Sequence, residues 1–193
     1  MKTEIAIQAE VVTDDTCQFI VDRPLIDGSK YFDSHDAAES SPLANKIFAI
    51  KNVDGVLISN NVVKVSKLGF EQWMPLAKQI GTLIREQLQS DAPAVDPAAF
   101  ADLPDEKEIR KRMIDLLQTK INPQVSEHGG FVALKDVKRN DVFLQLGGGC
   151  QGCGMATVTL RAGIEKMIRE SIPEVGAIVD ITDHAHGTNP YIK

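Results

Sequence analysis

Residues 131–154 read FVALKDVKRNDVFLQLGGGCQGCG, and this stretch decides the fold of the C-terminal half of the chain. Apolar and polar residues alternate over 131–137 and again over 142–146, and this period of two predicts two short β-strands. The polar residues at 138–141 predict the turn of a hairpin. Glycine then becomes the majority residue, so the second strand should run into a loop and not into a third strand.

Helical patterns lie on both sides of this hairpin. The apolar residues before it recur at helical spacing behind a capping box made by Asp105 and Glu108, and Asn122-Pro123 should end that helix. Two sets of positions carry the helical stripes: Ile109, Met113, Leu116, Leu117 and Ile121 before the hairpin, and Leu160, Ile164, Met167 and Ile168 after it. Residues 177–181 predict a third strand, so we expect the order α-β-β-α-β with a three-stranded mixed sheet.

The N-terminal half predicts a second unit that mixes helices and strands. Alternation over 5–11 and 17–21 predicts two strands, and Ser41-Pro42 is a good start for a helix over 42–50. Runs at 56–59 and 62–66, separated by Asn60-Asn61, resemble a hairpin, and an amphipathic helix should cover 73–88.

Residues 90–104 read SDAPAVDPAAFADLP and predict a linker, since three prolines and mostly small side chains can hardly make an element with a buried face. We therefore expect the α+β class, with two small α+β domains at 1–89 and 105–193 joined by a linker at 90–104.

Composition excludes several classes of protein. The 193 residues have a formal net charge of −6 and no cluster of Lys and Arg, which argues against nucleic acid as a partner. The N-terminus has no secretory pattern, and no apolar run is long enough for a membrane span. For the same reason we expect no membrane partner. Three cysteines do not make a disulfide framework, so we expect a cytoplasmic protein in a reducing compartment.

The chemistry should lie at Cys150 and Cys153, which stand three apart at the predicted start of a helix. Unpaired amides and the helix dipole favour thiolates there, and glycines at 147–149 and 152 would let the backbone approach an anionic inorganic group. Two cysteines cannot complete a site that usually takes four protein ligands. The others could come from His184 and His186 or from a second copy of the chain.

Two other interpretations of the CxxC remain open on these grounds: a dithiol oxidoreductase, and a structural dimer bridged by zinc. The other candidate side chains have simpler interpretations. We expect Cys17 and Trp73 to be core residues, His128 to belong to a turn or loop, and His35 to have no supporting neighbours.

The C-terminal half resembles the NifU C-terminal (Nfu) domain of iron-sulfur cluster scaffold and carrier proteins. The matching stretches are INPQVSEHGGFVAL (121–134), LGGGCQGCGMATVTLRAGIEKMI (146–168) and IPEV (172–175). Residues 30–89 are similar to the domain that precedes it in many of these proteins, through SPLANKIFAIKNVDGVLISNNVVKVSK (41–67) and Trp73.

The resemblance implies a carrier and not an enzyme. Cys150 and Cys153 would be the cofactor ligands of a 4Fe-4S cluster that bridges two protomers, and no residue would be catalytic. The partners implied are a second copy in a cluster-loaded homodimer, upstream cluster assembly machinery, and apo iron-sulfur client proteins that receive the cluster.

Overall fold

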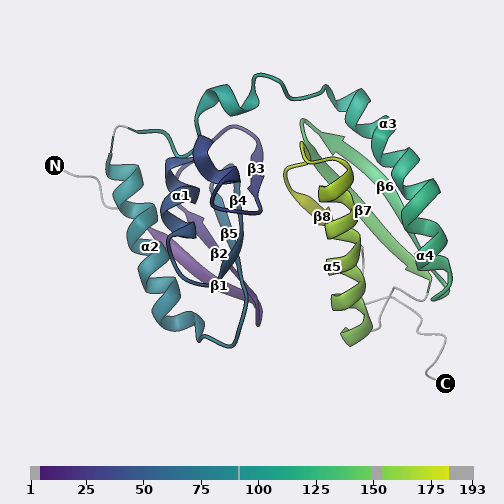
Figure 1. Cartoon of the computed structure of the whole chain (residues 1–193), viewed down its shortest axis with the longest axis horizontal. Helices are drawn as coiled ribbons and strands as arrows, with labels where there is room; N and C mark the ends of the chain where they lie inside the picture. The colour runs from purple at the N-terminus through teal and green to yellow at the C-terminus, as the bar shows by residue number, and fades with distance from the viewer. Residues whose placement is uncertain (1–4, 91, 149–153, 183–193) are drawn as a thin grey trace. The chain divides into compact units, whose positions relative to one another are not determined.

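The computed structural model describes residues 5–90, 92–148 and 154–182 and divides into two compact units between Asp102 and Leu103 (Figure 1). Each unit has its own sheet and its own hydrophobic core. Both units combine helices with a sheet, so the α+β class expected from the sequence is confirmed.

The first unit is built on a five-stranded sheet in the order β1-β2-β5-β4-β3, with every neighbouring pair antiparallel. Its strands are β1 (Ile7–Thr13), β2 (Thr16–Val21), β3 (Ser29–Phe32), β4 (Val53–Ser59) and β5 (Val62–Lys67). The strand β3 has no clear alternation over its four residues and is an addition to the sequence prediction. Asn60 in the β4–β5 turn has φ +44°. This is the left-handed conformation that asparagine tolerates in tight turns, and on that ground the sequence predicts a turn at Asn60-Asn61.

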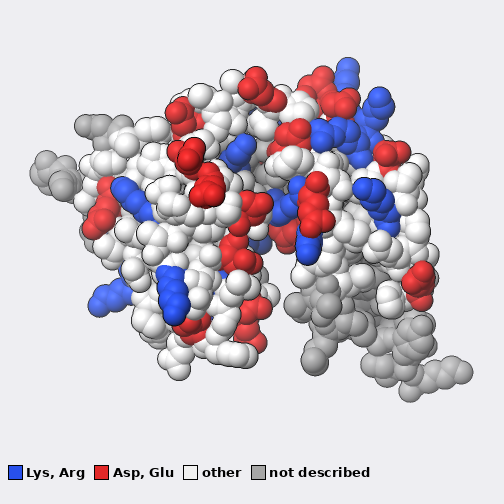
Figure 2. Space-filling model, viewed as in Figure 1, with Lys and Arg blue, Asp and Glu red and all other residues white. Residues whose placement is uncertain are grey.

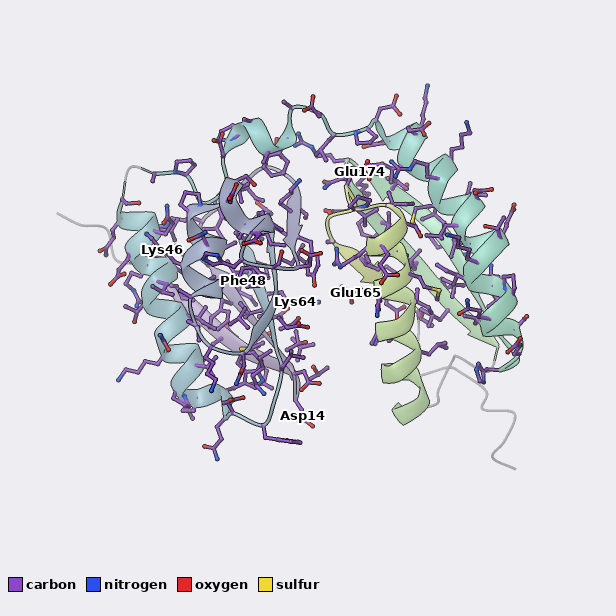
Figure 3. The ribbon with its side chains drawn as sticks, viewed as in Figure 1. Asp14, Lys46, Phe48, Lys64, Glu165 and Glu174 are labelled. Atoms are coloured by element: carbon purple, nitrogen blue, oxygen red, sulfur yellow. The ribbon has the colours of Figure 1, made fainter. Side chains whose placement is uncertain are left out.

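Two helices, α1 (Pro42–Phe48) and α2 (Trp73–Gln89), pack on one face of this sheet, and a short 3-10 turn, η1 (Ala37–Ser40), precedes α1. Ser41 caps α1 as predicted, because its Oγ accepts a hydrogen bond from the Ala44 amide at 3.0 Å. The ammonium of Lys46 donates to Gln87 Oε1 at 2.9 Å and so links α1 to α2 (Figure 3).

The expectation that residues 90–104 make no buried face is wrong for their middle part. Ala94 and Val95 are buried in the first core, and a 3-10 turn, η2 (Pro97–Phe100), follows them. The Ser41 hydroxyl donates to the Ala94 carbonyl at 2.6 Å, and the Asp96 amide donates to the Ser40 carbonyl at 2.7 Å. Side chains as small as those of Ala94 and Val95 are buried here, so the lack of long apolar side chains did not prevent burial.

The second unit has the predicted order α-β-β-α-β. Its elements are α3 (Glu106–Leu116), the π-helical turn η3 (Leu117–Ile121), α4 (Asn122–Ser126), β6 (Gly130–Lys138), β7 (Asp141–Gly148), α5 (Gly154–Ser171) and β8 (Ile178–Asp180). The sheet is mixed as predicted, because β6 and β7 are antiparallel whereas β7 and β8 are parallel. Core residues of α3 and α5 pack together with those of the sheet's inner face: Val132, Val137, Val142, Leu144 and Leu146.

The prediction that Asn122-Pro123 ends the first helix of this unit is wrong, because the helical path continues to Ser126. Proline lacks the amide that an α-helix interior needs, and its ring clashes with the carbonyl four residues earlier. The π-helical turn at Leu117–Ile121 changes the hydrogen-bond spacing just before Pro123, which then stands in the first turn of α4.

Two surface properties bear on function. Acidic and basic side chains are interspersed on the face shown in Figure 2, in keeping with the modest net charge of −6. Among the described residues, no helix has the length and apolar character that a membrane span requires.

Candidate metal centre

The predicted ligands Cys150 and Cys153 lie between the last residue of β7, Gly148, and the first residue of α5, Gly154. Residues 149–153 are outside the described part of the chain, as are His184 and His186. The structure therefore describes the elements on either side of the CxxC, β7 and α5, and the residues that hold them in place, which we call the frame.

Two glycines at the end of the hairpin lie against other atoms of the hairpin. Phe131 pairs with Gly147 across the strands, and its ring lies where a side chain at Gly147 would be: a Cβ there would be 2.2 Å from Phe131 Cζ. Gly148 has φ +64°, and a Cβ there would lie 2.4 Å from the Gly129 carbonyl oxygen. Contacts within the hairpin thus account for glycine at both positions, and the approach of this backbone to a cluster stays a prediction.

Asn122 holds the start of α4 against the edge strand of the hairpin. Its Oδ1 accepts from the Val132 amide at 2.8 Å, and its Nδ2 donates to the Val132 carbonyl at 3.0 Å. The side chain thereby replaces a neighbouring strand at this position of β6.

Side-chain contacts also fix β7, the second strand of the hairpin, and β8, which pairs with it. Thr182 Oγ1 accepts from the Leu146 amide at 2.7 Å, and Arg161 of α5 forms an ion pair with Asp180 of β8. Both elements that flank residues 149–153 are therefore tied into the second unit by side-chain contacts as well as by the core.

The helix α5 is anchored through its apolar stripe. Ile164 and Ile168 are buried, as the sequence pattern predicted, and the loop that follows α5 is tied to α3 by an ion pair of 3.0 Å between Arg112 and Glu174 (Figure 3). Since the helix begins at Gly154, directly after Cys153 in the sequence, its amino-terminal dipole favours negative charge at that end.

Cys17 and Trp73 are core residues, as predicted. The Cys17 side chain on β2 is wholly buried, and this burial raises the pKa of its thiol, which suits packing better than metal binding. Trp73 is 8% exposed, and its indole Nε1 donates to the Asp14 carbonyl at 2.9 Å.

The histidines within the described residues, His35 and His128, are exposed. Over residues 5–90, 92–148 and 154–182, His, Cys, Asp and Glu nowhere form a group of three or more that could hold a metal ion. The described part of the chain thus offers the CxxC no further ligand set.

Comparison with known proteins gives two family matches that divide the chain as the fold does. Residues 9–91 match the model described as "Scaffold protein Nfu/NifU N terminal", and residues 114–179, which include both cysteines, match "NifU-like domain". A relative from Stenotrophomonas maltophilia is 38% identical over 156 residues, which are 80% of this chain and 75% of the relative. The chain belongs to the Nfu/NifU family.

Other members of the Nfu/NifU family align over different extents. A protein of Pseudomonas syringae pv. tomato is 47% identical over 54% of both chains, and a NifU-like protein of Schizosaccharomyces pombe is 32% identical over 81% of this chain and 63% of its own. The bacterial relatives carry the name "Fe/S biogenesis protein NfuA". This chain therefore spans about half to three quarters of these relatives.

The solved structure of a NifU-like protein from Saccharomyces cerevisiae is 18% identical and has a TM-score of 0.46, over 50% of this chain and 91% of that one. A protein from Staphylococcus aureus gives 16% identity and a TM-score of 0.35, over 42% of this chain and 99% of the other.

Sequence reasoning missed three residues of the frame: Phe131, Asn122 and Thr182. Phe131 and Thr182 stood within or next to predicted strands, and nothing in their spacing marked a contact with the glycines or with β7. Asn122 was interpreted as part of a helix stop. The signal that could have found it is its position ten residues before Val132, on the helix that leads into the hairpin.

Proposed function

We propose that this chain is an iron-sulfur cluster carrier. Two copies would bind one 4Fe-4S cluster between them through Cys150 and Cys153 of each chain and deliver it to apo iron-sulfur proteins. The cluster is cargo in this account, and no substrate is turned over.

One observation carries the proposal. The segment that matches the NifU-like domain, residues 114–179, contains both cysteines, in a chain that aligns over 80% of its length with a protein named for Fe/S biogenesis. Thiolates are the usual protein ligands of iron-sulfur clusters, so the cysteines of this segment are the natural donors.

The number of ligands argues for two copies. A four-iron cluster takes four thiolates, and each chain offers two in the CxxC. The third cysteine, Cys17, is buried in the other unit, and the described residues hold no further group of metal ligands. A two-fold dimer would supply the missing pair.

Delivery follows from the same arrangement. A cluster held by only two thiolates of each chain can be released by stepwise exchange with the thiolates of a recipient. The start of α5 would favour the thiolate forms of the two cysteines. Upstream assembly machinery would supply the cluster, and a reducing compartment such as the cytoplasm would keep the cysteines available.

The two units would divide the work. We assign cluster binding to residues 105–193 and recognition of other proteins to residues 1–89, with residues 90–104 between them. The match of residues 9–91 to the N-terminal part of a scaffold protein supports this division.

Substitution of the ligands tests the proposal. Cys150→Ser and Cys153→Ser should each abolish cluster loading and loading-dependent dimerisation, while the unloaded chain keeps its far-UV circular dichroism. Cys17→Ser is the matched control, because it removes a thiol from the first unit and should load fully. A Cys150 or Cys153 variant that still takes up a stable cluster would refute the assignment.

The competing interpretations give other results. A dithiol oxidoreductase would form a reversible disulfide between Cys150 and Cys153 and reduce a model disulfide without iron. A zinc-bridged structural dimer would retain zinc when iron and sulfide are offered.

A further inference from the structure

The sheet of the second unit has one face that the described helices leave uncovered. The core residues of α3 and α5 pack with the inner-face residues of the sheet, and the alternate residues of β6, β7 and β8 point the other way. We call this the open face and define it by five side chains: Phe131, Phe143, Gln145, Val179 and Ile181. Phe131 is 52% exposed and Ile181 is 49% exposed, which is high for large apolar residues.

The Phe131 end of the open face adjoins the proposed ligands in sequence and in pairing. Phe131 lies over Gly147, and the next residue, Gly148, ends β7 two positions before Cys150. Two residues span at most about 7 Å of extended chain. Two copies that share one cluster must therefore place their Gly148 ends, with the Phe131 rings beside them, on either side of that cluster.

Charge favours a second copy of this chain as the occupant. In a two-fold contact the residues close to the axis lie near their own counterparts, so a charge on them would face a like charge of the second copy. Phe131, Gln145 and Ile181 carry no charge, and Lys138 lies at the other end of β6, with its Nζ 5.3 Å from the centre of the Phe143 ring. Glu127 and His128 belong to the turn before β6.

We propose that the open face packs, at its Phe131 end, against the same face of a second copy when two chains share a cluster. The inference rests on the proposed function, because a shared cluster is what brings the two copies together. It adds an interface that thiolate ligation alone does not require: Phe131 and Ile181 would exclude water around the cluster and strengthen the loaded dimer.

Glutamate substitutions test the interface. Phe131→Glu and Ile181→Glu place a like charge in each copy, and Phe70→Glu makes the same change at a fully exposed phenylalanine of the first unit. Each full-length variant is reconstituted anaerobically with iron and sulfide. The dissociation constant of the loaded dimer is then measured by light scattering over a range of concentrations, and the unloaded chains are unfolded in urea.

We expect at least a tenfold rise in the dissociation constant for Phe131→Glu and for Ile181→Glu, and no change for Phe70→Glu. If Phe131→Glu lowers the stability of the unloaded chain, because its ring covers Gly147, Ile181→Glu decides the question. Dimers of both variants that are as tight as wild type would overturn the interface and leave the carrier proposal intact. A wild-type chain that binds no cluster would overturn the carrier proposal itself, and the interface with it.

Discussion

Gly148→Ala should destabilise the second unit strongly, because glycine is required there on two separate grounds. The residue has φ +64°, which costs an alanine about 1–2 kcal/mol. The added Cβ would also lie 2.4 Å from the Gly129 carbonyl oxygen, and relieving such an overlap with backbone costs about 1–3 kcal/mol. We expect a total loss of about 2–5 kcal/mol in the free energy of unfolding.

Two other glycines of the same unit separate these contributions. Gly129 has φ +70° with open space around its missing Cβ, so Gly129→Ala should cost only the conformational part, about 1–2 kcal/mol. Gly163 lies inside α5 with nothing within 4 Å of that position, so Gly163→Ala should stabilise the unit by about 0.5–1 kcal/mol.

Urea unfolding of the full-length chain provides the measurement. Far-UV circular dichroism follows both units, whereas fluorescence of the chain's single tryptophan, Trp73, reports on the first unit. The fluorescence transition should therefore stay in place in all three variants. If Gly148→Ala lowers the free energy of unfolding no more than Gly129→Ala does, the close contact between position 148 and the Gly129 carbonyl is wrong. A large loss of stability in Gly163→Ala would contradict the placement of Gly163 inside α5 with open space around it.

Three further changes test contacts elsewhere. Ser41→Ala removes the cap of α1 and leaves the Ala94 carbonyl without its hydroxyl donor, so the tryptophan transition should lose about 2–4 kcal/mol; a loss below 1 kcal/mol would contradict the double role. Asn122→Ala deletes both hydrogen bonds to β6 and should cost about 2 kcal/mol in the second unit, seen as a lower midpoint in urea by circular dichroism, with an unchanged midpoint as the contrary result. A hydrogen bond from Arg23 lowers the pKa of Asp22 to about 2. This contact therefore stabilises the fold above about pH 4, and the stabilisation is lost as the pH falls toward 2. An NMR titration of Asp22 should show the lowered pKa, and Arg23→Ala should return it toward 3.8.

The sequence was sufficient where one local rule acted alone. Ser41 before Pro42 marked the start of α1, Asn60 marked the β4–β5 turn, and the stripe through Ile164 and Ile168 marked α5. The cap and the turn depend on local backbone geometry, and the stripe depends on one buried helix face. Each of these can be recognised from residues that are close together in the sequence.

Features that depend on contacts between distant segments were not predictable in this way. The carbonyl of the buried Ala94 accepts a hydrogen bond from a hydroxyl 53 residues earlier in the chain. The passage of the helix through Pro123 depends on a π-helical turn, for which no residue pattern is specific. In both places the tertiary contacts override the local preference for a linker or a helix stop.

The pairing of Phe131 shows the same limit for the site. Lys138 pairs with Asp141 at the hairpin turn, and an unbroken register from there would put Phe131 opposite Gly148. The irregularity between Leu134 and Asp136 shifts the pairing by one residue, so that Phe131 faces Gly147 instead. The cysteines were identified from residue type and spacing, whereas the contacts that frame them required coordinates.

The central claim is that two chains share one cluster through four thiolates. Anaerobic reconstitution of the wild-type chain with iron and sulfide tests it most directly, with iron and sulfide content, visible absorption and molar mass measured on one sample. We expect a four-iron spectrum, about two iron and two sulfide ions for each chain, and the mass of a dimer. A colourless monomer that carries a disulfide between Cys150 and Cys153 would contradict the account.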